Sequence, residues 1–298
     1  MRILLTGGGG FLGAWVVRRL TQAGDEVRVL EVHGNRSLVR SIAGEIADRL
    51  DWRVGDIADT AAVIDAAEGC DGLVHLAGVL TPACQIDPLA GARVNVLGTL
   101  NAFEAARRHG IRQVAYTSSG GVYGTDDRSE PFPMTHYGAF KLANEGSARA
   151  YWADAGIASI GFRPFVIYGP GRQGGLTAGP TLACRAAARG EPYVIPFTGS
   201  AGMVHVDDVA AAVEVAVRST LQGARTLNLT GRVATMDEVV DGIRRVVPDA
   251  GIACAGPALP SGASAANEWG NEVLALGRER TLDQGLADTV KFYRRQPD

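Results

Sequence analysis

Tyr137 and Lys141 are the residues in this sequence best suited to acid–base chemistry, because they stand four positions apart in a segment with helical character. Positions i and i+4 share one face of a helix, so the lysine ammonium can lie beside the phenol. A phenol loses its proton only at about pH 10, and it becomes a useful base at neutral pH when a positive charge stabilises the phenolate. The same spacing also occurs on solvated helices without any catalytic role.

Two serines, Ser118 and Ser119, follow an expected strand and precede Gly120. A hydroxyl at a strand end can hydrogen-bond a substrate oxygen and stabilise the charge that develops on it. The two serines could equally do no more than close the strand end.

A glycine-rich turn near the N-terminus is typical of a site that binds a dinucleotide cofactor. Gly7, Gly10 and Gly13 follow the spacing G-x-x-G-x-x-G between an apolar strand and a helix that begins at Phe11 and Leu12. Glycine lets the backbone turn tightly and approach a pyrophosphate, and the helix N-terminus favours negative charge. In this context the motif predicts a dinucleotide site that Gly7, Gly10, Phe11 and Leu12 contact, and the alternative is a glycine turn without a ligand.

Glu31 lies at the end of the second expected strand, where a dinucleotide fold places an acid that bonds the adenosine ribose. A carboxylate there repels a 2′-phosphate, which favours NAD over NADP as the cofactor. Arg36 follows closely and argues the other way. The alternative for Glu31 is an exposed acid at a strand end.

Further cofactor contacts are expected after the next two strands. Asp56 could bond the adenine amino group while Ile57 packs on the ring, or Asp56 could cap the helix that starts near Thr60. Ala77 and Gly78 are small enough for the backbone to approach the cofactor closely.

The elements that must position these residues indicate an α/β protein, a doubly wound Rossmann-type parallel sheet with a small interwoven C-terminal substrate lobe. Strand, helix and strand within the first 32 residues form a βαβ unit, and such units build parallel sheets. We expect residues 1–168 to form the NAD-binding domain, which the chain re-enters at about 203–230, and residues 169–202 and 231–298 to form the smaller lobe. The expected strands are at 3–5, 26–32, 52–54, 72–77, 113–117, 159–166, 203–206 and 225–229, with a short apolar run at 193–197. The expected helices are at 11–23, near 60, and at 87–109, 136–155, 180–189, 207–218, 236–246 and 281–294, and the segment 253–264 is expected to be irregular.

The composition argues against several classes of protein. A net charge of −3 over 298 residues gives no electrostatic case for binding nucleic acid or an anionic membrane. No apolar stretch is long enough to span a membrane, and the early core strand leaves no room for a signal peptide, so we expect a cytoplasmic protein. The four cysteines are expected to be buried free thiols, no metal site is expected, and His75 is expected to be a core histidine.

Taken in chain order, a set of motifs resembles the extended short-chain dehydrogenase/reductase family, also called NAD-dependent epimerase/dehydratases. The motifs run from residue 7 to about residue 209 and are specific for the family rather than for one member. They are Gly7-x-x-Gly10-x-x-Gly13, Asp56, Asn95-x-x-Gly98-Thr99, Ser118-Ser119 ahead of Val122-Tyr123-Gly124, Tyr137-x-x-x-Lys141, Arg163-Pro164, Gly169-Pro170-Gly171 and His205-Val206-Asp207-Asp208-Val209.

The resemblance implies hydride transfer between NAD and an alcohol or ketone. It implies that Tyr137 exchanges a proton with the substrate hydroxyl, while Lys141 holds the nicotinamide ribose and lowers the tyrosine pKa. Ser119, with Ser118 as the alternative, would bond the substrate oxygen. Asn95 and Pro164 would lie at the cofactor, although Asn95 could be only a buried polar group. The family's usual dimer surface also implies a homodimer through a four-helix bundle of the two long helices.

Two positions depart from the nucleotide-sugar members of the family. Val166 stands where those members usually have an asparagine, and Ala201 stands where they usually have the arginine that grips the diphosphate. Aliphatic side chains cannot replace these contacts. The departure favours a small substrate without a nucleotide. The candidate pocket walls are residues 79–82 and 174–180, and the candidate substrate contacts are Leu80, Thr81, Ser119, Gly120, Val166 and Arg172.

The leading hypothesis is therefore an NAD-dependent dehydrogenase for a secondary alcohol on a small polar substrate, such as a sugar acid or hydroxy acid. Arg172 could bind a carboxylate of this substrate or could be a loop arginine in solvent. The second hypothesis is a nucleotide-sugar epimerase resembling UDP-glucose 4-epimerase, or a dehydratase, with tightly bound NAD. The third is a non-catalytic dinucleotide-binding regulator.

Overall fold

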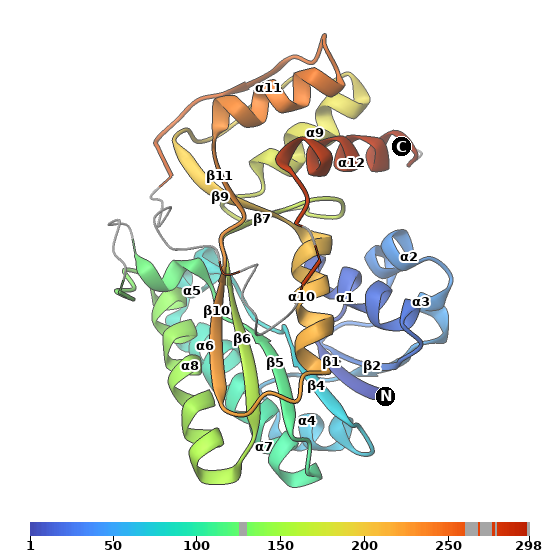
Figure 1. Ribbon diagram of the computed structural model, residues 1–298, viewed down its shortest axis with the longest axis vertical. Coiled ribbons are helices and arrows are strands. Elements are labelled where there is room, and N and C mark those ends of the chain that lie inside the picture. The colour runs from blue at the N-terminus through green and yellow to red at the C-terminus, as the bar shows by residue number, and fades with distance from the viewer. Residues whose placement is uncertain (125–129, 260–267, 269–275, 278, 297–298) are drawn as a thin grey trace.

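The computed structural model describes residues 1–124, 130–259, 268, 276–277 and 279–296. Its central feature is a sheet of seven parallel strands in the order β10-β6-β5-β4-β1-β2-β3 (Figure 1). The strand order reverses between β1 and β4, and ligands of such sheets bind at the carboxyl ends of the strands around this point. The predicted α/β fold is confirmed. The strands are β1 (Arg2–Thr6), β2 (Glu26–Glu31), β3 (Asp51–Val54), β4 (Gly72–His75), β5 (Gln113–Thr117), β6 (Ala158–Pro164) and β10 (Ala224–Leu229).

Helices cover both faces of this sheet, so its strands are apolar on both sides. Ile3 and Leu5 of β1 join the apolar cluster under α1 and α10, whereas Leu4 joins the cluster under α4 and α7. Figure 1 shows α8 beside α7 on that second side. The helices around the sheet are α1 (Phe11–Gln22), α2 (Ser37–Ala43), α3 (Ile46–Arg49), α4 (Thr60–Ala67), α5 (Thr81–Ile86), α6 (Pro88–Ala92), α7 (Gly98–His109), α8 (His136–Ala155) and α10 (Val206–Val217).

A smaller group of elements lies beyond the carboxyl ends of the main strands, at the top of Figure 1. One sheet has the order β11-β9-β7, and a second pairs β12 with β8. Their buried side chains form an apolar cluster of their own, which includes Tyr168, Met203 and Leu286. The predicted division of the chain into two domains stays a prediction. The elements are β7 (Val166–Tyr168), β8 (Tyr193–Ile195), β9 (Ser200–His205), β11 (Arg232–Thr235), β12 (Ile252–Cys254), α9 (Gly179–Arg189), α11 (Met236–Val246) and α12 (Leu282–Arg294).

The strand expected at 159–166 is wrong at its carboxyl end. β6 stops at Pro164, which has no amide hydrogen for a sheet ladder, and after Phe165 the chain enters β7 of the other sheet. The segment expected to be irregular at 253–264 likewise begins within β12, because Ile252 and its neighbours pair with β8. Residues 260–264 of that segment lie outside the described residues. β11 and helices α2, α3 and α5 have no counterpart among the expected elements.

The helix expected at 87–109 is a helical run with a π-helical turn (Arg93–Leu97) between α6 and α7. In this turn the carbonyl of Asn95 accepts hydrogen bonds from Thr99 Oγ1 at 2.7 Å and Asn144 Nδ2 at 3.0 Å. These side-chain donors satisfy the carbonyl where the helical ladder widens, and π-helical turns frequently mark functional sites.

All four cysteines are free thiols, and Cys70, Cys84 and Cys184 are buried as predicted. The prediction of burial is wrong for Cys254, which is half-buried because it ends the short edge strand β12. His75 is a core histidine, since its two ring nitrogens lie 2.8 and 3.0 Å from the hydroxyls of Thr6 and Thr99.

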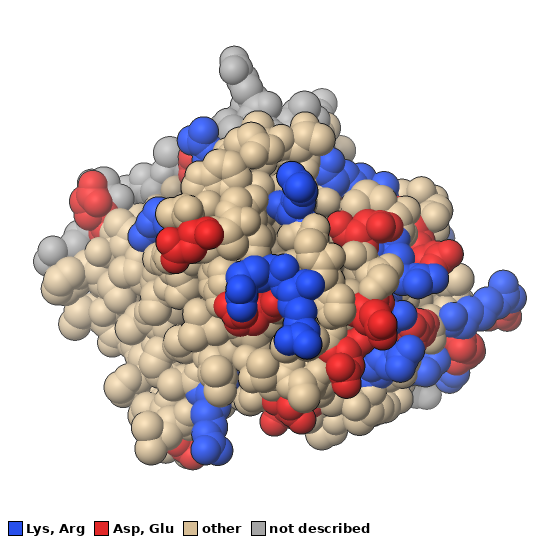
Figure 2. Space-filling view, turned by 90° about the horizontal axis from the view of Figure 1, so that it is seen from below, with Lys and Arg blue, Asp and Glu red and all other residues tan. Residues whose placement is uncertain are grey.

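Charged side chains of both signs are interspersed on the face of the molecule shown in Figure 2. Several cations have an acidic partner in the structure, such as Arg2 with Glu26 and Arg107 with Glu104. Within the part of the chain that the structure describes, no helix is both long and apolar enough to cross a membrane.

Candidate active site

The glycine turn lies at the reversal point of the sheet, between β1 and β4. Gly7 has a φ of 72°, and a Cβ on it would come within 2.7 Å of the Ala77 amide nitrogen. A Cβ on Gly13 would overlap the carbonyl oxygen of Gly7. Both positions therefore require glycine, the first for its backbone angle and the second for close packing. Gly10 is the N-cap of α1 and makes no side-chain capping bond, so the first amides of the helix face outward without a capping side chain. This cradle fits a pyrophosphate.

Glu31 closes this cradle from the end of β2. Its carboxylate accepts hydrogen bonds from the amides of Gly9 at 3.1 Å and Val32 at 2.9 Å. Arg36 is engaged elsewhere, because it donates to the Ala47 carbonyl at 3.1 Å and lies 5.1 Å from the centroid of the Trp52 ring. The acid rather than the arginine is thus the charged side chain fixed at the glycine turn.

Asp56 does not cap the helix near Thr60, and this alternative is wrong. Asp59 is the N-cap of α4 and accepts from the amides of Ala61 and Ala62. Asp56 instead bonds the Ala58 amide at 2.9 Å and keeps an exposed carboxylate. Ile57 is buried against Gly98, and a Cβ on Gly98 would come within 2.9 Å of the Ile57 side chain. The close packing of these two residues joins the end of β3 to the start of α7.

Asn95 organises the chain after β4. Its side-chain amide donates to the Val79 carbonyl at 3.0 Å and accepts from the Val79 amide at 3.2 Å. A Cβ on Gly78 would lie 2.8 Å from Asn95 Oδ1 and 3.7 Å from Lys141 Nζ. Asn95 is thus a buried polar group that also shapes the loop where Gly78 approaches Lys141.

Tyr137 and Lys141 lie in the first two turns of α8, which Thr135 caps by accepting from the Gly138 amide. The ammonium of Lys141 lies 5.7 Å from the centroid of the Tyr137 ring and donates to the Thr117 carbonyl at 2.8 Å. The lysine is 3% exposed, and this burial lowers its pKa to about 8. Burial raises the pKa of Tyr137 to about 12, and a hydrogen bond with Ser119 acts in the opposite direction.

The two adjacent serines have different partners. Ser118 is buried and donates to Glu145 Oε1 at 2.5 Å. Ser119 caps the 3₁₀ turn (Gly120–Tyr123) by accepting from the Gly121 amide at 3.0 Å, and a Cβ on Gly121 would lie 3.3 Å from Ser119 Oγ and 3.9 Å from the Tyr137 ring. Ser119 is therefore the serine beside the phenol.

The expected substrate contacts divide into two groups. Leu80 and Thr81 begin α5, and Leu80 lies next to Gly175 of the loop that follows β7, where a Cβ would come within 3.2 Å of the leucine. Gly120 faces the ring of Phe165, and a Cβ on Gly120 would lie 3.0 Å from this ring. Val166, by contrast, is 6% exposed, and its side chain belongs to the apolar core of the small lobe.

Ala201, the second position that departs from the nucleotide-sugar pattern, is 5% exposed in the same apolar core as Val166. Pro164 is buried at the end of β6. No phosphate-binding side chain stands at either departing position.

Arg172 is neither free in solvent nor paired with an acid among the described residues. It is half-buried, and its guanidinium donates to the Ile167 carbonyl and to Thr177 Oγ1, the latter at 2.8 Å. A Cβ on Gly175 would lie 3.5 Å from its Nη2, which puts the guanidinium beside the Leu80 contact. Burial lowers its pKa to about 10, and the phenol of Tyr137 acts in the opposite direction. An arginine with these surroundings can accept a carboxylate partner.

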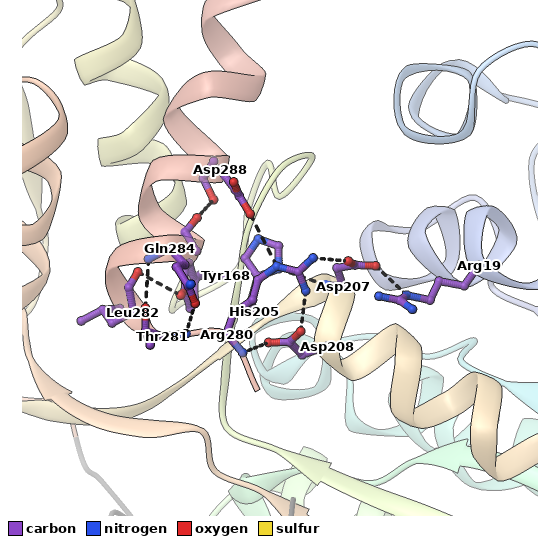
Figure 3. Close-up of polar contacts among 12 residues, drawn as sticks. Arg19, Tyr168, His205, Asp207, Asp208, Arg280, Thr281, Leu282, Gln284 and Asp288 are labelled. Atoms are coloured by element: carbon purple, nitrogen blue, oxygen red, sulfur yellow. Dashed lines mark hydrogen bonds and ion pairs between the residues drawn. The ribbon is translucent and has the colours of Figure 1, made fainter. Parts of the chain in front are cut away.

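The His205-Val206-Asp207-Asp208 motif joins α1, the helix that follows the glycine turn, to the small lobe (Figure 3). Arg19 of α1 donates to Asp207 at 2.7 Å, and Arg280 bonds Asp207 at 2.7 Å and Asp208 at 2.5 Å. His205 lies edge-on to Tyr168, with ring centroids 5.4 Å apart. Burial lowers the pKa of His205 to about 3, so the imidazole is neutral. The motif therefore ties elements together and does not lie among the residues around Tyr137.

Sequence reasoning missed Glu145 in the polar network around the site, and it named Arg163 only within a family motif, without a role in this network. Glu145 lies one helical turn after Lys141 on the same face of α8, and this spacing is the signal that could have pointed to it. Within the described part of the chain, no group of three or more His, Cys, Asp or Glu side chains could hold a metal ion.

Comparison with known proteins gives consistent matches. A family model described as "NAD dependent epimerase/dehydratase family" matches residues 3–230. UDP-glucose 4-epimerase of Mycolicibacterium smegmatis is 31% identical, covering 99% of each chain. Uronate dehydrogenase of Pseudomonas syringae pv. tomato is 31% identical over 54% of this chain and 58% of that protein. The crystal structure of Thermus thermophilus UDP-glucose 4-epimerase complexed with NAD has a TM-score of 0.83 at 25% identity, covering 99% of each chain.

Proposed function

Because the chain belongs to the NAD-dependent epimerase/dehydratase family, an enzyme family whose cofactor is NAD, we propose that it is a dehydrogenase for a secondary alcohol on a small, acidic, polar substrate. The observation that carries the proposal is the packing of Ser119, Tyr137 and Lys141 beside the loop at Gly78. Members of this family are enzymes, so the hypothesis of a non-catalytic regulator is set aside.

NAD, when bound, supplies a hydride acceptor at its nicotinamide. Gly7, Gly10 and the amides of Phe11 and Leu12 would hold its pyrophosphate, and Glu31 its adenosine ribose. The position of Asp56 and Ile57 at the end of β3 supports adenine contacts, and Ala77, Gly78, Asn95 and Pro164 remain candidates nearer the nicotinamide.

The proton of the substrate hydroxyl passes to Tyr137 Oη in this proposal. Without help the phenol stays protonated at neutral pH, since burial raises its pKa to about 12, and little phenolate is present to accept the proton. The Lys141 ammonium lies close enough to stabilise the phenolate, and the hydroxyl of Ser119 can bond the substrate oxygen while the proton moves. Lys141 would also hold the nicotinamide ribose.

The substrate class follows from what surrounds the tyrosine. Val166 and Ala201 provide no phosphate contact, which supports a substrate without a nucleotide diphosphate. Arg172 supplies a cation that lacks an acidic partner among the described residues, which supports a carboxylate on the substrate. Leu80, Thr81 and Gly120 would line the remaining walls.

A nucleotide-sugar epimerase, or a dehydratase, is the second candidate. The observation that favours it is the 31% identity with UDP-glucose 4-epimerase of Mycolicibacterium smegmatis across 99% of both chains. Such an enzyme must reduce its keto intermediate before release, so it would retain NAD and produce no net NADH.

One panel of substrates separates these candidates. The purified protein is mixed with NAD and sugar acids, hydroxy acids, neutral polyols, UDP-sugars or GDP-sugars, and the absorbance of NADH is followed beside product analysis. If the protein is a dehydrogenase, NADH should form with a sugar acid or a hydroxy acid. Turnover of nucleotide sugars, with stoichiometric NAD copurifying and no net NADH, overturns it in favour of the epimerase.

We also propose a cytoplasmic homodimer, formed through the helices from α6 to α7 and α8. The support is that these helices lie side by side, while nearby Ile86 and Leu89 are apolar and 87% and 80% exposed. Light scattering should give twice the chain mass of 31.2 kDa, and a species of the chain mass alone would contradict the dimer.

A further inference from the structure

A chain of buried hydrogen bonds runs behind the candidate active site, and its centre is Glu145 on α8. Glu145 lies one helical turn after Lys141 and about two turns after Tyr137, so the three residues share a helix face. Its side chain is 0% exposed. The proposed proton transfer uses no atom of this carboxylate, which leaves its burial to be explained.

The Glu145 carboxylate accepts three hydrogen bonds from two strands. Ser118 Oγ donates to Oε1 at 2.5 Å, and Arg163 donates through Nε at 2.8 Å to Oε1 and through Nη2 at 2.5 Å to Oε2. Ser118 follows β5 and Arg163 belongs to β6. One carboxylate therefore ties α8 to the two strands nearest Ser119.

Arg163 extends the chain to the turn that follows Ser119. Its Nη1 donates to Tyr123 Oη at 2.6 Å, and the Tyr123 hydroxyl donates to Asn228 Oδ1 at 2.9 Å. Asn228 is the residue opposite Arg163 in the register between β10 and β6. Ser119 is thus held on both sides, through Ser118 before it and through Tyr123 at the end of its own turn.

Glu268 closes the chain from the C-terminal part of the sequence. The Glu268 amide donates to the Asn228 carbonyl at 3.0 Å, and the Asn228 amide donates to Glu268 Oε2 at 2.8 Å. Three groups on Asn228 are therefore fixed, namely its amide, its carbonyl and its side-chain oxygen. The side chain that receives the Tyr123 hydroxyl has little freedom to move.

A buried ion pair is weak evidence for stability, because desolvation offsets much of the attraction, and it is best attested as a means of selecting one arrangement. Here the arrangement selected is that of α8 against the end of β5. We propose that Glu145, through Arg163 and Tyr123, is a positioning residue that sets Ser119 against Tyr137. This inference rests on the proposed function in taking Ser119 and Tyr137 as the reacting pair.

The test observes Tyr137 directly, without a substrate. The chain has seven tyrosines, so protein labelled with ¹³C at tyrosine Cζ gives few signals, and Tyr137→Phe identifies the one from Tyr137. Ser119→Ala calibrates how this signal responds when the neighbouring serine hydroxyl is lost. Tyr123→Phe removes only the hydroxyl that joins Arg163 to Asn228, and it should shift the Tyr137 signal in the same direction as Ser119→Ala.

Tyr168→Phe is the matched control. Tyr168 is 1% exposed, against 3% for Tyr123, and its hydroxyl donates to the Leu282 carbonyl at 3.4 Å, apart from the chain that leads to Glu145. It should leave the Tyr137 signal in place. An unmoved signal in Tyr123→Phe, or an equal shift in both variants, would overturn the proposal. Thermal unfolding of both variants checks that each is folded.

Activity adds a second measurement. With an acid that the wild type oxidises, Tyr123→Phe should lower kcat about tenfold with KM for NAD unchanged, because a small misplacement costs rate rather than cofactor binding. Glu145→Gln should lower kcat further. Unchanged kcat in both variants contradicts positioning. A wild type that oxidises no substrate contradicts the proposed function instead, and the ¹³C spectra still decide the role of Glu145.

Discussion

The ammonium of Lys141 lies 5.7 Å from the centroid of the Tyr137 ring, one helical turn away, and donates to the Thr117 carbonyl at 2.8 Å. Burial favours the neutral form of each group, so it lowers the pKa of Lys141 to about 8 and raises the pKa of Tyr137 to about 12. The tyrosine can therefore act as a base only while positive charge stays beside it.

Tyr137→Phe should lower kcat about 10²- to 10⁴-fold, the range of a general acid–base group, while the affinity for NAD changes little. Isothermal titration gives the affinity and steady-state kinetics gives kcat. Tyr151→Phe is the control on the same helix, because its hydroxyl bonds Glu104 at 2.8 Å, away from Ser119. Wild-type turnover by Tyr137→Phe would remove Tyr137 from the mechanism.

Lys141→Met should abolish turnover and yet raise the free energy of unfolding at pH 7 by about 1–3 kcal/mol, because it removes a buried ammonium. The folded pKa is about 8, below the ordinary 10.5, so the unfolded state binds more protons between these values. The free energy of unfolding of the wild type therefore rises with pH between about 8 and 10.5. Urea unfolding should show the gap between variant and wild type narrowing from pH 8 to 10.5, and a constant gap would contradict the buried charge.

Glu31→Gln should improve binding of NADP relative to NAD about tenfold, which corresponds to about 1.4 kcal/mol. The amide keeps an oxygen for the Gly9 amide but no longer repels a 2′-phosphate. Glu26→Gln, at the exposed opposite end of β2, is the control. Equal cofactor preference in Glu31→Gln and wild type would show that another residue selects the cofactor.

Gly13→Ala should prevent NAD binding and destabilise the fold by roughly 1–3 kcal/mol, because the new Cβ overlaps the Gly7 carbonyl. Gly146→Ala in the middle of α8 should instead stabilise by roughly 0.5–1 kcal/mol, since only a flexible arginine end lies nearby, at 3.8 Å. Denaturant unfolding and NAD titration of both variants measure the contrast, and equal effects would rule out the steric explanation.

Arg172→Met should raise KM for carboxylate substrates about 10- to 100-fold, as expected for a hydrogen bond to a charged group worth about 1.5–3 kcal/mol. KM for NAD should not change. The internal control is a neutral alcohol of the same size, whose KM should be unaffected. If acid and alcohol respond alike, Arg172 holds its own loop, through Ile167 and Thr177, and does not bind the carboxylate.

Local spacing was enough to predict much of this site. The glycine spacing at Gly7 and Gly13, the helix that carries Tyr137 and Lys141, and the parallel α/β fold depend on contacts along one strand–turn–helix unit or one helix face. The choice between Ser118 and Ser119 could not be made in this way, because it depends on Glu145, a partner on another element. The sequence also could not decide whether Asp56 caps a helix, and the structure shows that Asp59 supplies this cap instead.

By itself the sequence determined the sheet, the cofactor cradle and the tyrosine–lysine pair, since periodicity and glycine spacing act within a few residues of the chain. Only the tertiary structure decided where β6 gives way to β7, that Val166 and Ala201 belong to one apolar core, and that Arg172 is half-buried in its own loop. The physical reason is that pKa values, burial and hydrogen-bond partners depend on residues far apart in sequence, as between Ser119 and Tyr137 or Arg163 and Glu145.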